Sequence, residues 1–161
     1  MSTDERRIGT HSGRAWTFAD HLSAAEILPL RYADMAAVEA AHHLFGDLDP
    51  SLAATVEEDD VLVAGHGLGR GQGGLAAAKA LRVGGFRAVV AASFADGFDE
   101  ALLAVALPPL VVDAPATFHT GNRLRINFEA GTIANLSSGD RQPVRNLNDV
   151  LLERLRDLIG R

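Results

Sequence analysis

The fold of this chain is set out most plainly between residues 60 and 92, which read DVLVAGHGLGRGQGGLAAAKALRVGGFRAVVAA. The runs 60–64 and 86–92 are of strand length and apolar except for Asp60 and Arg87. Between them a glycine-rich loop over 65–74 leads into a helix over about 75–83, which two further glycines stop. A strand, a crossover helix and a second strand predict two buried parallel strands with a right-handed connection.

The residues before this unit predict several short elements. Pro29 disfavours helix at the residue before it, and Asp34 is a suitable N-cap for the helical pattern that follows it. The expected segments are a flexible N-terminal tail over 1–13, a strand from residue 14, an extended stretch over 26–32, a helix over 35–45 and a helical turn over 51–55.

The last third of the chain changes in character, because alternating segments and turn residues replace long helices. This pattern predicts antiparallel hairpins. The expected segments are a helix over 94–106, a strand at 110–112, a strand over 123–128, its hairpin partner over 133–136 and a closing amphipathic helix over 150–159. No linker or repeat interrupts 14–161, so we expect a single domain there.

Composition excludes several classes of protein. The chain has 161 residues, a net charge of −6 and no cysteine. Disulfides, a thiol nucleophile and cysteine-bound zinc or iron–sulfur clusters on this chain are therefore excluded. A nucleic-acid partner is not expected, because the usual basic surface is missing. No apolar run approaches membrane-spanning length and the N-terminus lacks a signal-peptide core, so we expect a cytoplasmic protein with no membrane partner.

The glycine-rich loop has three possible interpretations. Glycines let a backbone approach a ligand closely, and a helix N-terminus presents free N–H groups to an anion. The loop therefore suits a carboxylate or phosphate ligand. The spacing Gly69-x-Gly71-x-x-Gly74 also matches the dinucleotide fingerprint, although too little chain follows for a complete dinucleotide-binding domain. Tight packing of the loop without any ligand is the third interpretation.

Beyond this loop the chain resembles a known family, the small subunits of 3-isopropylmalate dehydratase, which are swivelling domains of the aconitase superfamily. The resemblance runs from about residue 13 to 158, and its pieces occur in the family's order. The similar pieces are GRAWTFAD at 13–20, ILPLRY at 27–32, FGDLDP at 45–50, DVLVAG at 60–65, ASFA at 92–95 and FEAGTIANL at 128–136.

The resemblance implies a fold, a partner and a reaction. The fold is an α/β, three-layer β/β/α swivelling domain. The partner is an aconitase-like large subunit that carries a [4Fe-4S] cluster on its own cysteines, so this chain needs no cofactor. The reaction is removal or addition of water on a small hydroxylated di- or tricarboxylic acid substrate.

The loop departs from the family where chemistry is expected. The family's loop reads Gly-x-Gly-Ser-Ser-Arg-Glu-His, and Gly69 and Gly71 keep its frame. Gln72 and Gly73 stand where the two serines stand, and Gly74 stands at the arginine. The second serine is the family's catalytic base and the arginine binds a substrate carboxylate. Glycine supplies neither group, so the catalytic residues of this chain are unknown.

Several polar residues remain candidates for substrate binding. Arg31 matches the family's Pro-x-Arg element, and a structural salt bridge is its alternative. Arg70 and Gln72 lie on the loop, where a guanidinium or an amide suits an anion, against simple solvent exposure. His66 follows the strand directly and is either a base or a group that orders the loop. With Gly69, Gly71, Gly73 and Gly74, these residues form the predicted binding set, and no metal site is expected.

Three functions are compatible with these observations. The first is a hydro-lyase subunit with an altered substrate or altered catalytic residues. The second is a non-catalytic lid or regulatory partner of the large subunit. The third is a stand-alone domain that binds small anions through the glycine loop.

Overall fold

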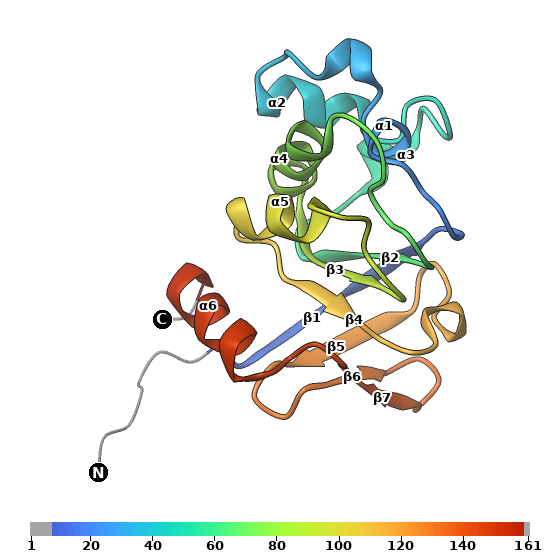
Figure 1. Ribbon diagram of the computed structural model, residues 1–161. Coiled ribbons are helices and arrows are strands. Elements are labelled where there is room, and N and C mark those ends of the chain that lie inside the picture. Colours follow the sequence, from blue (N-terminus) through green and yellow to red (C-terminus); the bar gives the residue numbers. More distant parts are fainter. Residues whose placement is uncertain (1–7, 160–161) are drawn as a thin grey trace.

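The computed structural model describes residues 8–159, which build one seven-stranded sheet with helices packed against it (Figure 1). The strands are β1 (Thr10–Thr17), β2 (Asp60–Ala64), β3 (Phe86–Ala91), β4 (Pro109–Val111), β5 (Arg123–Asn127), β6 (Thr132–Asn135) and β7 (Arg141–Pro143). The α-helices are α1 (Ala24–Ile27), α2 (Ala37–Ala40), α3 (Leu52–Thr55), α4 (Gly74–Gly84), α5 (Phe98–Ala104) and α6 (Asp149–Ile159). Short 3-10 turns are η1 (Leu30–Tyr32), η2 (Ala41–His43) and η3 (Pro115–Thr117).

The sheet has a parallel half and an antiparallel half in the order β4-β3-β2-β1-β5-β6-β7. Strands β1 to β4 are parallel, and β1 also pairs antiparallel with β5. Because successive strand residues point to opposite faces, Leu62 joins the apolar cluster under α1 to α5. Val61 and Val63 join a second cluster against the antiparallel half and Leu155 of α6. The expected three-layer β/β/α fold is confirmed.

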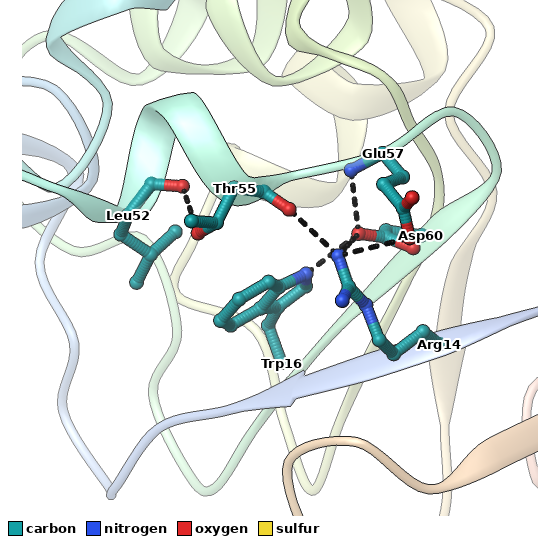
Figure 2. Close-up of polar contacts among 6 residues, drawn as sticks. All are labelled: Arg14, Trp16, Leu52, Thr55, Glu57 and Asp60. Atoms are coloured by element: carbon teal, nitrogen blue, oxygen red, sulfur yellow. Dashed lines mark hydrogen bonds and ion pairs between the residues drawn. The ribbon is translucent and has the colours of Figure 1, made fainter.

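The amino end of β2 is fixed by a polar cluster around Asp60, whose side chain is almost fully buried (Figure 2). Its Oδ2 accepts hydrogen bonds from the indole of Trp16 at 2.7 Å, the backbone N–H of Glu57 at 2.8 Å and the guanidinium of Arg14 at 3.1 Å. Arg14 also donates to the carbonyl of Thr55 at 2.7 Å. These bonds tie β1, β2 and the segment after α3 together, so they fix the register of the two strands.

The first strand is longer than the sequence predicts. It begins at Thr10 rather than at residue 14, because Thr10 to Arg14 pair with β5 in antiparallel register. The expectation of a tail up to residue 13 is therefore wrong for residues 10–13, and residues 1–7 lie outside the described part of the chain.

The segment expected to be extended over 26–32 holds two helical turns, α1 and η1, so that prediction is wrong. Ser23 caps α1 in a capping box, in which its hydroxyl accepts from Glu26 N–H at 3.1 Å and Glu26 accepts from Ser23 N–H at 2.9 Å. Only Leu28 is extended, as Pro29 requires.

Two predicted helices are shorter than expected. The helix expected over 35–45 is a single turn, α2, continued by η2, and Ala36 rather than Asp34 is its N-cap. The helix expected from 94 begins at Phe98, because Gly97 takes a left-handed conformation with φ of +86°. Strand β7 was not expected. The remaining predicted strands and the closing helix agree with the structure to within about one residue.

The outer edge of the parallel half is covered by the side chain of Asn146. Its amide oxygen accepts from Val111 N–H at 2.9 Å and its amide N–H donates to the Pro109 carbonyl at 2.8 Å. The Asn146 side chain therefore makes two hydrogen bonds to the backbone of β4 that a neighbouring strand would otherwise make. Within residues 8–159, no helix combines the length and the apolar character needed to cross a membrane.

Candidate functional site

The glycine-rich loop joins the carboxyl end of β2 to the start of α4 (Figure 1). Four alternate glycines, Gly67, Gly69, Gly71 and Gly73, have φ values of +67°, +88°, +87° and +86°. Residues with a Cβ rarely adopt this region, so the backbone of the loop itself requires glycine at these positions.

The first half of the loop is firmly anchored. The N–H of His66 donates to Asp20 Oδ1 at 2.8 Å, and the N–H of Gly67 donates to Ser93 Oγ at 2.9 Å. Gly69 is buried, and a Cβ there would overlap the ring of Phe98. The segments after β1 and β3 therefore hold residues 65–69 in place, and this half of the loop is tightly packed.

The second half of the loop is open. Gly71 and Gln72 are exposed, and a Cβ on Gly71 would meet no atom within 4 Å. Gly73 is the left-handed N-cap of α4 and lies beside Leu30. The first N–H groups of an α-helix have no partner within the helix, so the start of α4 presents free donors next to Gln72. This half is the part that suits an anion.

A hollow of about 650 Å³ lies at the carboxyl ends of β1, β2 and β3. Its polar lining comes from Thr17, Asp20, His66 and His119, and Phe118 supplies part of its apolar wall. The Nδ1 atom of His66 lies 3.5 Å from Ser93 Oγ. The backbone N–H of His66 anchors the loop and the residue lines the hollow, and its role as a base stays a prediction.

A second, smaller hollow of about 370 Å³ shares Asp20 with the first and is lined by Arg70, Glu26 and His21. Arg70 Nε donates to the carbonyl of His21 at 3.3 Å, and His21 has a strained φ of +62°. The guanidinium is thus held against the neighbouring segment. It faces this hollow together with two carboxylates, so anion binding by Arg70 stays a prediction.

Arg31 lies in an exposed ion pair. Its guanidinium binds Asp47 through two hydrogen bonds, at 2.6 and 3.2 Å, and stacks over the ring of Tyr32. These hydrogen bonds lower the pKa of Asp47 and raise the pKa of Arg31. The salt-bridge alternative is what the structure shows, and substrate binding by Arg31 stays a prediction.

The predicted binding residues are therefore not brought together in one place. His66 lines the large hollow, Arg70 lines the small one, and residues 71–74 lead into α4. Gly69 is packed against Phe98, and Arg31 lies apart in its ion pair. The sequence reasoning missed Asp20 and His119, which the fold brings to the same hollow as His66. Ligands of parallel sheets bind beyond the carboxyl ends of the strands, and that rule would have singled out Asp20.

No cluster of side chains that could hold a metal ion is found in the described residues. No group of three or more His, Asp or Glu side chains gathers in residues 8–159, and the sequence has no cysteine. The adjacent His42 and His43 do not form a pair, because His43 stacks on Tyr32 with ring centroids 3.8 Å apart.

Comparisons with known proteins identify similar chains over nearly the whole length. The Aconitase C-terminal domain family matches residues 49–115. The chain is 33% identical over 147 residues to 3-isopropylmalate dehydratase small subunit 2 of Archaeoglobus fulgidus, covering 90% of this chain and 88% of that protein. It is 32% identical over 150 residues to the methanogen homoaconitase small subunit of Methanothermobacter thermautotrophicus, covering 92% and 87%. The crystal structure of 3-isopropylmalate dehydratase from Methanocaldococcus jannaschii superposes with a TM-score of 0.78 at 26% identity, covering 93% of this chain and 96% of that one.

Proposed function

This chain belongs to the family of 3-isopropylmalate dehydratase and homoaconitase small subunits, and from that premise we propose that it works as the small subunit of a hydro-lyase. Its partner is an aconitase-like large subunit, and its substrate is a hydroxy di- or tricarboxylic acid. The similarity over 90% of the chain, which includes the whole glycine loop, is the observation that carries this proposal.

The open half of the loop gives this chain a means to bind such a substrate. The free N–H groups at the start of α4 attract a carboxylate, since they combine unpaired donors with the positive end of the helix dipole. In this proposal Gln72, an exposed residue two positions before α4, donates its amide N–H to a carboxylate or hydroxyl oxygen. This chain therefore orients the substrate through backbone and amide groups.

The proton transfer needs a group that the loop does not supply. Loss of water breaks a C–H bond and a neighbouring C–OH bond and forms a C=C bond between the two carbons. The proton from carbon goes to a base, and the hydroxyl group takes up another proton and leaves as water. Gly73 and Gly74 have no side chain to take that proton or to bind a second carboxylate. The base in this proposal is either the imidazole of His66 or a group on the large subunit. The [4Fe-4S] cluster implied by the family belongs to the large subunit, because this chain has no ligand for it.

The experiment that tests this proposal is anaerobic co-expression with an aconitase-like large subunit encoded in the same genome. Copurification, iron content and water addition to a panel of unsaturated diacids are measured. A stoichiometric, iron-containing complex that hydrates one of these acids supports the proposal. A complex that forms and hydrates none of them supports the alternative of a non-catalytic lid, which the bare Gly73–Gly74 segment favours. Absence of a complex contradicts both.

The His66→Gln variant of an active complex then locates the base. If His66 takes the proton, turnover falls at least about a hundredfold while complex formation is unchanged. If turnover is retained, the base lies on the large subunit.

A further inference from the structure

The hollow of about 370 Å³ beside the glycine loop is lined by charged residues of both signs. Arg70 comes from the loop, Asp20 follows β1 and Glu26 lies in α1. Within residues 8–159 the guanidinium of Arg70 forms no ion pair with either carboxylate. Opposite charges that line one small hollow without pairing with each other leave both signs open to a ligand.

Each of these three charged groups is held by one hydrogen bond to the backbone. Arg70 Nε donates to the carbonyl of His21 at 3.3 Å. One oxygen of Asp20 and one oxygen of Glu26 each accept a backbone N–H, at 2.8 and 2.9 Å. Within the described residues, the terminal nitrogens of Arg70 and the second oxygen of each carboxylate have no partner. Groups that are held in place before binding lose less conformational entropy when a ligand pairs with them.

His21, which also lines the hollow, has a left-handed backbone conformation with φ of +62°. Residues with a Cβ rarely adopt this conformation, and strained residues of this kind concentrate at functional sites. In this conformation the N–H of His21 donates to the carbonyl of His66 at 2.7 Å, and its own carbonyl accepts from Arg70. The strained residue therefore connects the glycine loop to the guanidinium at the hollow.

The charges of this hollow match a zwitterion rather than a dianion. The guanidinium of Arg70 suits a carboxylate, because it donates two parallel hydrogen bonds to such a group. Asp20 and Glu26 attract an ammonium group, and both repel a second carboxylate. The hollow also has an apolar wall, in which Leu48 is 47% exposed and Phe18 is partly buried. A ligand with a carboxylate, an ammonium group and an apolar side chain therefore meets all of these groups.

We infer that this hollow binds a free α-amino acid with an apolar side chain, whose carboxylate pairs with Arg70 and whose ammonium group lies against Asp20 and Glu26. The volume of about 370 Å³ is that of a small-molecule site. The inference goes beyond the proposed function, because this ligand is not the hydroxy acid substrate. It is tested on the chain alone, so its failure leaves the proposed function unaffected.

Titration of the full chain with L-valine, followed by NMR chemical shifts, tests the inference. Two analogues each lack one charge, since N-acetyl-L-valine has no ammonium group and L-valinamide has no carboxylate. We expect L-valine to bind saturably and each analogue to bind at least about tenfold more weakly. Saturable binding of malate, a hydroxy diacid, in place of L-valine overturns the inference. So does the absence of saturation by L-valine up to about 50 mM. This series uses the wild type only and does not depend on the folding of a variant.

Two variants then locate the bound amino acid, with a control outside the hollow. Arg70→Gln removes the guanidinium, and Glu26→Gln removes a negative charge while glutamine can still complete the capping box. Each variant is expected to raise the dissociation constant of L-valine at least about tenfold. Arg125→Gln removes an exposed arginine of β5 and is expected to change it less than about twofold. Melting temperatures show that each variant is folded. Unchanged binding in both hollow variants, or an equal loss in Arg125→Gln, overturns the inference.

Discussion

The two ends of strand β2 differ in how completely their polar groups are satisfied. At the amino end, one buried carboxylate oxygen of Asp60 receives three hydrogen bonds from three segments of the chain. At the carboxyl end, the loop after Ala64 is tied down for five residues and then left open, with Gln72 exposed. The same strand is therefore a structural anchor at one end and the start of a binding surface at the other.

This difference shows how residues of the loop can change while the fold of the domain is kept. The anchored groups cannot change without loss of stability, because each is matched by a buried partner. Leu75 is exposed, so it can depart from the family's glutamate without disturbing the sheet. Gly73 differs, because its φ of +86° favours glycine and it lies against Leu30.

The largest effect is expected at the amino end. Asp60→Ala leaves the indole of Trp16 and the N–H of Glu57 without an acceptor, and leaves Arg14 partly unpaired. We expect a loss of about 3 kcal/mol in the free energy of unfolding, measured by urea denaturation. The control is Glu57→Ala, which removes an exposed carboxylate 3.4 Å from Arg14 and is expected to cost less than about 0.5 kcal/mol. Equal losses for the two variants contradict the role of Asp60 as the anchor.

The glycine loop allows a comparison within one backbone conformation. Gly69 and Gly71 have φ values of +88° and +87°, but only Gly69 is packed against a side chain, the ring of Phe98. Gly69→Ala combines backbone strain with overlap and is expected to cost about 3 kcal/mol. Gly71→Ala meets only the strain and is expected to cost about 1 kcal/mol. Urea denaturation of both variants measures the difference, and a similar cost for both contradicts the division of the loop into two halves.

At the open end we expect loss of activity without loss of stability. Gln72→Ala removes an exposed amide, so its melting temperature should equal that of the wild type. In the complex with the large subunit, loss of one hydrogen bond to the substrate is expected to lower kcat/KM about tenfold. A lowered melting temperature with unchanged kcat/KM contradicts the assignment of Gln72 to the binding surface.

The sequence predicts the parallel half well because its signals are local. The apolar run 60–64 has the observed bounds of β2, and the run from Phe86 gives β3 to within a residue. Two errors arose where one signal hid another. Pro29 pointed to an extended chain, whereas the Ser-x-x-Glu signature of Ser23 and Glu26 starts a helical turn just before it. The apolar pattern around Gly97 predicts a helix from residue 94, whereas the left-handed Gly97 is the N-cap of α5 and delays its start to Phe98.

The site was predictable only in part, and for a related reason. Glycines at alternate positions indicate an unusual loop, so the location of the loop can be predicted from the sequence. The large hollow depends instead on Asp20, His66 and His119, which lie on three separate segments. Only the pairing of β1 beside β2 brings these segments to one edge, and pairing of distant strands leaves no local pattern to read.

The smallest expected effect is a pH dependence at the anchored end, where His11 lies on β1. Burial and the nearby positive charge of Arg87 lower the pKa of His11 from its usual 6.5, and Asp59 opposes this shift. A lowered folded-state pKa means that the unfolded chain binds the proton more readily. His11 therefore contributes stability that is fully present above pH 6.5 and is lost as the pH falls through the lowered value.

Urea denaturation of the wild type at about pH 7.5 and about pH 5 should show this loss. In the His11→Gln variant the free energy of unfolding should depend less on pH. Because the imidazole of His11 stands edge-on to Phe128 with centroids 5.3 Å apart, the glutamine variant also sets the baseline for lost packing. If the free energy of unfolding depends on pH in that variant as it does in the wild type, another group causes the dependence. His11 would then not be one of the groups that distinguish the anchored end from the open end.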